Sequence, residues 1–179
     1  MIRGHKFMKR FGLFFFLAAL ATFSSRSAQV GLINITGAIG PATASYINRA
    51  LAMSAGRGDE CLIIQLDTPG GLLDSTEKIV QSIYDAKLPT VVYVAPAPAR
   101  AGSAGVFITM AAHVAAMAPG TNIGAAHPVA MGGGEMDKTM KDKVENDAAA
   151  YIKSIAEQRG RNVAWAEDAV RKSVSVTEQ

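Results

Sequence analysis

The chain has 179 residues, of which 49% are hydrophobic and 18% are charged, so it is long enough for one domain with a core and short for two. Its formal net charge of +3 arises in residues 1–27, which hold five basic and no acidic residues, whereas the remainder carries 13 basic and 15 acidic side chains. This balance argues against a nucleic-acid partner. A single cysteine excludes an internal disulfide, and three widely separated histidines argue against a metal site, so we expect neither metal nor cofactor.

Residues 1–27 have the layout of a secretory signal peptide. Basic residues precede an uncharged apolar stretch at 11–23, and small and polar residues follow it. The stretch is short for a membrane span, so we expect cleavage after Ser24 or Ser27, with a retained anchor as the alternative. The sequence thus predicts an exported protein, periplasmic or on the extracytoplasmic face of the membrane, whose domain occupies residues 28–179.

Short apolar runs alternate with amphipathic segments along that domain. The pattern predicts strands at 30–35, 61–66 and 89–94, with a short strand at 114–118 and a loop or strand at 123–129. It predicts helices at 44–53, from Asp74 onward, at 103–115, from the glycine-rich break at 131–134 to about 158, and from Asn162 to 170. Asp74 is expected to cap its helix with Glu77 as the capping-box partner. This alternation indicates an α/β domain with a largely parallel sheet, and a final loop at 173–179 suggests a chain cut short inside a longer protein.

Two glycines follow the strand at 61–66, where a strand passes into a loop. At Gly70 and Gly71 the bare backbone can aim N–H groups at a ligand and stabilise an oxyanion, although a tight turn would use the same residues. Ser103 begins a helix among residues too small to block access, so it can be a nucleophile, a helix cap, or both.

A nucleophilic serine needs a base, and a lysine serves only when uncharged, which requires apolar surroundings to lower its pKa from about 10.4. Lys143 and Lys141 both lie at or near the apolar arc of the long helix, and periodicity alone does not separate them; Lys138 points nearer to solvent. The alternative interpretation is that all three lysines are solvated charges on an amphipathic helix. A Ser–His–Asp triad with His127 and Asp67 is a further alternative, although Asp67 is better suited to fixing the loop. The arc consists of Met136, Met140, Val144, Ala148, Tyr151 and Ile155.

Five motifs in family order resemble the ClpP-class protease domain of long-form NfeD proteins, membrane-bound serine proteases related to signal peptide peptidase A. They are Asp67-Thr68-Pro69-Gly70-Gly71, Gly102-Ser103-Ala104-Gly105, residues 118–125, Lys143-Val144-Glu145-Asn146-Asp147 with Tyr151-Ile152-Lys153, and Gly160-Arg161-Asn162. The resemblance implies the ClpP/crotonase spiral of ββα units. It also implies a Ser–Lys dyad, with Ser103 as nucleophile and Lys143 as general base. The implied oxyanion donors are the N–H groups of Gly71, shared with Gly70, and of Ala104.

The resemblance further implies hydrophobic segments of stomatin-like membrane proteins as substrates, a homo-oligomer, and a continuation of the protein into transmembrane helices. We therefore expect a membrane-associated serine endopeptidase whose substrate adds as an extended strand beside residues 71–73, with Leu72 and Leu73 binding it. Two alternatives remain: a non-catalytic docking domain for stomatin-like partners, and a crotonase-like acyl-CoA enzyme, against which export argues.

Overall fold

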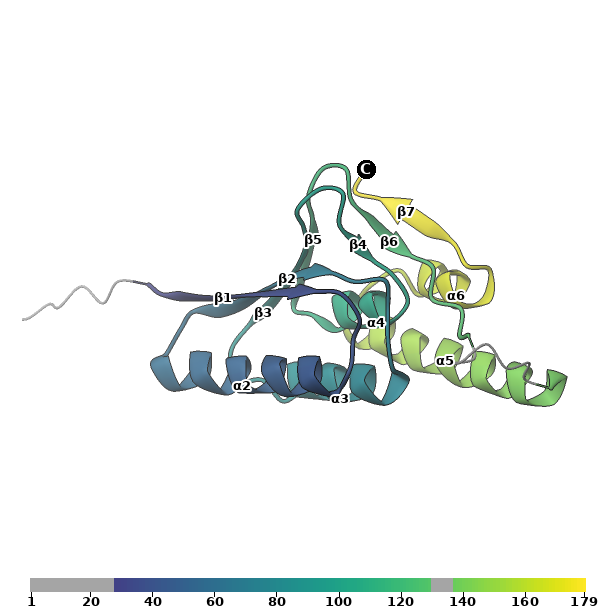
Figure 1. Cartoon of the computed structure of the whole chain (residues 1–179), viewed down its shortest axis with the longest axis horizontal. Helices are drawn as coiled ribbons and strands as arrows, with labels where there is room; N and C mark the ends of the chain where they lie inside the picture. The colour runs from purple at the N-terminus through teal and green to yellow at the C-terminus, as the bar shows by residue number, and fades with distance from the viewer. Residues whose placement is uncertain (1–27, 130–136) are drawn as a thin grey trace, which may run out of the picture.

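The computed structural model describes residues 28–129 and 137–179, and it forms two sheets with five helices around them (Figure 1). The strands are β1 (Val30–Thr36), β2 (Cys61–Asp67), β3 (Thr90–Val94), β4 (Arg100–Ala101), β5 (Val114–Met117), β6 (Asn122–Gly124) and β7 (Ser175–Thr177). The helices are α2 (Pro41–Arg57), α3 (Leu73–Tyr84), α4 (Ala104–Ala111), α5 (Lys138–Gln158) and α6 (Val163–Arg171).

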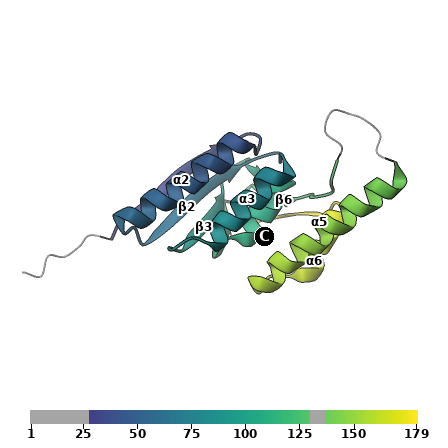
Figure 2. The same cartoon turned by 90° about the horizontal axis from the view of Figure 1, so that it is seen from below.

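The larger sheet is parallel throughout, with strand order β1-β2-β3-β5. Its strands alternate buried and more exposed residues, as a sheet covered on one face requires. Helices α2 and α3 lie side by side along that covered face (Figure 2). On the other face, the register aligns an apolar row across all four strands, and its end residues Leu32 and Val114 are 61% and 52% exposed.

The smaller sheet has the order β4-β6-β7, with β4 and β6 parallel and β6 and β7 antiparallel. Helix α4, every residue of which is buried, contacts β3 of the larger sheet and β4 and β6 of the smaller one. It packs against α3 on one side and α5 on the other. Only Gly102 and Ser103 lie between β4 and α4, so Ser103 is fixed where the two sheets meet.

The parallel α/β architecture predicted from the sequence is confirmed, and so is the Asn162 cap, whose side chain accepts from the Trp165 N–H at 3.0 Å. Three details differ. The helix predicted from Asp74 begins at Leu73 with Leu72 at its cap and no capping side chain, so the Asp74–Glu77 capping box is wrong. The helix predicted at 103–115 ends at Ala111, and a strand, β7, replaces the loop predicted near the C-terminus.

The predicted signal peptide, the glycine-rich break at 131–134 and Met136 lie outside the described residues. Across the described ranges, none of the helices combines the length and apolar character that a membrane crossing needs.

Candidate active site

Ser103 sits on a sharp turn between β4 and α4, in a backbone conformation that residues with side chains rarely adopt. Its φ is 47° and its ψ is −110°. The turn is held because the Ser103 N–H donates to the Ala125 carbonyl oxygen at 2.7 Å. The hydroxyl makes no capping hydrogen bond to α4, so the purely structural helix-cap role that the sequence left open is not what this side chain does. A strained strand-to-helix turn is the typical way to present a nucleophilic hydroxyl.

Two backbone N–H groups beside this turn are available to a ligand. Within the described residues no hydrogen bond is recorded for the N–H of Gly71 or of Ala104, the first residue of α4. The Gly70 N–H, by contrast, already donates to Thr68 Oγ1 at 3.0 Å. The geometry therefore favours Gly71 and Ala104 over Gly70 as oxyanion donors, with the positive end of the α4 dipole beside them.

A cavity of about 740 Å³ opens in front of Ser103, and its walls are mostly apolar. They come from the loop before α2, the start of α3, α4, the segment after β6 and the inner side of α5. The lining residues are Ala38, Ile39, Gly40, Pro69, Gly71, Leu72, Leu73, Thr76, Ser103, Ala104, Phe107, Ala126, His127, Pro128, Val129, Val144 and Ala148. Such a cleft suits an apolar ligand with a few polar groups placed against it.

Leu72 and Leu73 line the cavity, but they do not form the strand that the sequence analysis expected a substrate to pair with. The Leu72 N–H already donates to the Ile39 carbonyl oxygen at 2.9 Å, and Leu73 is the first residue of α3. A helical residue cannot continue a ladder of strand hydrogen bonds. Strand addition along residues 71–73 therefore stays a prediction, with Gly71 as its best-placed residue, and the two leucines contribute side chains to the wall.

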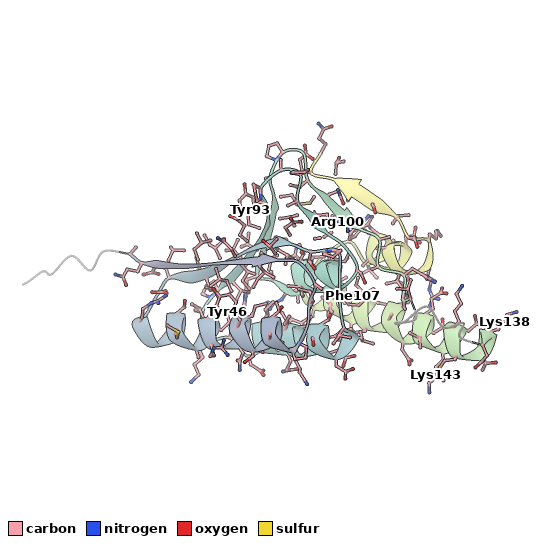
Figure 3. The ribbon with its side chains drawn as sticks, in the orientation of Figure 1. Tyr46, Tyr93, Arg100, Phe107, Lys138 and Lys143 are labelled. Carbon is pink, nitrogen blue, oxygen red and sulfur yellow. The ribbon has the colours of Figure 1, made fainter. Side chains whose placement is uncertain are left out.

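The structure does not bring Lys143 to Ser103. On α5, Val144 and Ala148 face the cavity, whereas Lys143, one residue earlier and about 100° around the helix, is exposed and does not line it. In Figure 3 its side chain hangs below α5, away from the rest of the molecule, and Lys138 extends from the far end of the helix. The expectation that apolar surroundings desolvate Lys143 is not met in this arrangement, and Lys141 is exposed as well.

The alternative triad of Ser103, His127 and Asp67 is also not assembled. The Asp67 carboxylate accepts from the Arg100 N–H at 3.0 Å and so fixes the start of β4, the loop-fixing role that the sequence favoured. His127 lines the cavity with Ser103, but its Nδ1 lies 3.0 Å from the Val170 carbonyl oxygen rather than near Asp67.

Two arginines that bind the C-terminal end of α4 were not predicted from the sequence. Arg159 Nε donates to the Ala111 carbonyl oxygen at 2.7 Å, and Arg161 donates to the carbonyls of Met110 and Ala112 at 2.9 and 2.8 Å. These are carbonyl groups that the last turn of a helix leaves without partners. Burial, with the nearby Arg159 charge, lowers the pKa of Arg161 from its ordinary value. The Gly160-Arg161-Asn162 motif was the available signal, since an arginine just past a helix end is placed to reach another helix.

Thr68 was missed as well. Its side chain is fully buried, and Oγ1 both accepts from the Gly70 N–H and donates to the Gly70 carbonyl oxygen at 3.2 Å. The threonine therefore fixes the conformation of the double-glycine loop from beneath it.

Comparison with known proteins identifies the family and the fold. Residues 29–179 match the family described as NfeD1b, N-terminal domain. Membrane-bound protease PH1510 of Pyrococcus horikoshii is 39% identical over 150 residues, which are 83% of this chain but 34% of that protein. The chain thus spans about a third of that relative.

Two solved structures of the 1510-N membrane-bound stomatin-specific protease are each 38% identical with a TM-score of 0.78 and cover 84% of this chain. One is a serine-to-alanine mutant, of which 73% is covered; the other is a lysine-to-alanine mutant in complex with a substrate peptide, of which 69% is covered. ClpP1 from Listeria monocytogenes, at 19% identity and a TM-score of 0.64 over 82% of both chains, shares the fold. The predicted ClpP-class fold is confirmed, and the chain belongs to the NfeD1b N-terminal domain family.

Proposed function

We propose that this domain is a serine endopeptidase in which Ser103 attacks a peptide carbonyl. The observation that carries the proposal is the strained turn that presents Ser103 to an apolar cavity, with the unpartnered N–H groups of Gly71 and Ala104 beside it. In the first step, a bond forms between Ser103 Oγ and the carbonyl carbon while the carbonyl oxygen becomes an oxyanion between those donors. The C–N bond then breaks, the amine leaves with a proton, and water releases the acyl group by the reverse path.

Lys143 is the proposed base, and Ser103 Oγ–H would pass its proton to the uncharged Nζ. The support is the family motif together with the 1510-N variant that lacks a lysine and was solved with a substrate peptide. Since Lys143 is exposed here, the proposal requires that α5 turn or shift so that Nζ enters the cavity when substrate binds.

The proposed substrates are apolar segments of membrane-associated proteins of the stomatin type. The support is the apolar lining around Ser103 and the stomatin specificity of the 1510-N protease. We further propose that the domain is exported through a signal peptide at residues 1–27 and that it acts on the extracytoplasmic face of the membrane in a protein that continues into transmembrane helices. The apolar row ending at Leu32 and Val114 supports the proposed homo-oligomer, because such a face is commonly covered by a second copy.

The experiment is cleavage of fluorogenic apolar peptides by the wild-type chain and by three variants. Ser103→Ala and Lys143→Ala should each lower kcat by a factor of about 10³ or more, while the matched control Lys141→Ala, also exposed on α5, should leave kcat within about twofold. Loss of activity in Lys141→Ala with retention in Lys143→Ala would assign the base to the other lysine. Full activity in Ser103→Ala would overturn the endopeptidase proposal.

A second candidate is a non-catalytic docking domain for stomatin-like partners, and the exposed position of Lys143 favours it. It predicts that the wild-type chain binds an apolar peptide but never cleaves it, and that a fluorophosphonate fails to label Ser103 at alkaline pH. Labelling of Ser103 in the wild-type chain, abolished in Ser103→Ala, would exclude the docking function as the sole one.

A further inference from the structure

The cavity described above contains one ionisable side chain among its described lining residues, His127, and the proposed reaction gives it no role. The other polar side chains on the wall are Ser103, the proposed nucleophile, and Thr76, whose hydroxyl donates to the Leu72 carbonyl oxygen at 2.9 Å. A half-buried imidazole on an otherwise apolar wall is placed to bind a polar group of whatever the cavity holds.

The orientation of the His127 ring follows from one hydrogen bond. Nδ1 lies 3.0 Å from the carbonyl oxygen of Val170, and because a carbonyl oxygen only accepts, Nδ1 carries the hydrogen. Val170 belongs to the last turn of α6, where carbonyl oxygens lack partners inside the helix and carry the negative end of the helix dipole. In the neutral imidazole, the bond therefore selects the tautomer in which Nε2 is an unprotonated acceptor. Since the two ring nitrogens point in divergent directions, Nε2 is turned away from α6.

The two residues before His127 are held by backbone hydrogen bonds. The Ala126 N–H donates to the Ala169 carbonyl oxygen at 2.8 Å, and the Ala125 carbonyl oxygen accepts from the Ser103 N–H at 2.7 Å. The backbone leading into His127 is thus bound both to the end of α6 and to the turn that carries Ser103. The bond from Nδ1 to Val170 then orients the imidazole on that backbone.

A peptide in this cavity needs a hydrogen-bond acceptor there. Each N–H of an extended peptide that enters an apolar cleft loses its water and must find an acceptor. Elsewhere on the wall, the carbonyl oxygens of Ile39, Gly40 and Leu72 already accept from Leu72, Ala44 and Thr76. His127 Nε2 supplies an acceptor that nothing among the described residues uses.

We propose that His127 is a substrate-binding residue that accepts a hydrogen bond at Nε2 from one backbone N–H of the bound peptide, with the Val170 carbonyl oxygen fixing its tautomer. This inference rests on the proposed peptidase function and adds to it a residue that positions the peptide relative to Ser103. His127 takes no part in proton transfer, so its loss should weaken binding more than it slows the chemical step.

Two substitutions test the roles of the two ring nitrogens of His127 separately. In His127→Asn the side-chain amide can place its N–H where Nδ1 stood and keep the bond to Val170, but nothing replaces the Nε2 acceptor. In His127→Gln the amide oxygen can reach the position of Nε2 and restore an acceptor, while the bond to Val170 is lost. Both are made in the full chain with Ser103→Ala, so that binding is measured without turnover, and again with Ser103 intact, so that KM and kcat are measured separately.

The probe is a short fluorescein-labelled peptide of leucine, valine and alanine, with lysines at its ends for solubility. A set of analogues replaces each backbone N–H in turn by an ester oxygen. We expect His127→Asn to raise Kd and KM about tenfold with kcat within about twofold, and His127→Gln to recover most of the affinity. One ester analogue should bind the parent chain about tenfold more weakly than the all-amide peptide does. To His127→Asn, the same analogue and the all-amide peptide should bind with equal affinity.

Unchanged Kd in His127→Asn, or equal losses in both chains for every ester position, would overturn the inference. A fall in kcat with unchanged KM would also overturn it, because that result belongs to a proton-transfer role. Absence of peptide cleavage by the chain with Ser103 intact would refute the peptidase function, whereas cleavage with unaltered binding in His127→Asn would refute only the role of His127.

Discussion

Gly70 and Ser103 are in direct contact across the candidate active site. A Cβ atom built on Gly70 would stand 2.6 Å from Ser103 Cβ and 3.2 Å from Ser103 Oγ, and Gly70 has a φ of +123° that residues with side chains rarely adopt. The neighbouring Gly71 is equally constrained, since a Cβ there would overlap the Ile39 carbonyl group. The double glycine is therefore required by the close approach of the loop to the turn that carries Ser103.

Gly70→Ala is expected to abolish peptide hydrolysis and to lower the free energy of unfolding by about 2–3 kcal/mol, because it adds both a clash and backbone strain. The matched control is Gly56→Ala on α2, where a Cβ meets no atom within 4 Å; it should raise stability by about 0.5–1 kcal/mol and preserve activity. Urea unfolding and kcat/KM measure the two effects. An active Gly70→Ala would mean that the loop can retreat from Ser103.

Two buried threonines provide a second matched pair. Thr68 Oγ1 exchanges hydrogen bonds with both backbone groups of Gly70, whereas Thr109 Oγ1 is buried on α4 with no recorded partner among the described residues. Thr68→Val leaves the Gly70 N–H unpaired and should reduce stability by about 1–3 kcal/mol, with a fall in kcat as the loop relaxes. Thr109→Val removes an unsatisfied hydroxyl and should be neutral or stabilising. Equal losses for both in urea unfolding would contradict the role assigned to Thr68.

Arg161→Met tests how α4 is held from its C-terminal end. The substitution keeps most of the apolar stem but removes the donors to the Met110 and Ala112 carbonyl oxygens, so stability should fall by about 2–3 kcal/mol. Arg171→Met is the control, since Arg171 is exposed and makes its bonds to Asn146 and Glu145 at the surface; a loss below about 1 kcal/mol is expected. A similar thermal shift in both variants would show that the buried contacts add nothing.

The sequence predicted the parallel sheet because short apolar runs alternate with amphipathic helical segments, and β1, β2 and β3 lie within a residue or two of their predicted bounds. The predicted start of α3 was wrong, because a local capping signal competed with a tertiary contact. At the start of α3, Asp74 offered a cap, but the loop contact between Leu72 and Ile39 begins the helix one residue earlier. A single tertiary hydrogen bond is enough to move such a boundary.

The structure brings some of the predicted site residues together and leaves others apart. The motifs around Gly71 and Ser103 are brought together, because Thr68 and Ala101, just before each motif, form a parallel bridge where the two sheets meet. Lys143 is not, because a position at the margin of an apolar arc is decided by how α5 is rotated, which depends on tertiary packing. A substrate-binding role for His127 was not predicted from the sequence, because its position depends on Val170, 43 residues later, and no local pattern reveals such a contact.

Tyr151 makes the fold sensitive to alkaline pH. Its ring stacks on Phe107, a residue of the cavity wall, with centroids 5.7 Å apart, and burial, with smaller contributions from Glu77 and Tyr84, raises its pKa to about 12. An unfolded tyrosine titrates near 10, so the folded chain binds more protons between about pH 10 and 12. The stability from neutral Tyr151 is therefore complete below pH 10 and is lost as pH rises toward 12, by about 1 kcal/mol at pH 11.

Tyr151→Phe removes this titration while keeping the ring stack, so wild type and variant should have similar Tm values at pH 8, and the variant should be the more stable at pH 11. Burial also raises the pKa of Tyr84, but that residue is present in both proteins, and its contribution cancels in the difference. Thermal unfolding followed by circular dichroism at the two pH values provides the measurement. If the Tm difference between the two proteins does not change between pH 8 and pH 11, the Tyr151 phenol ionises as readily in the folded chain as in the unfolded one, and its burial against Phe107 is not maintained in solution.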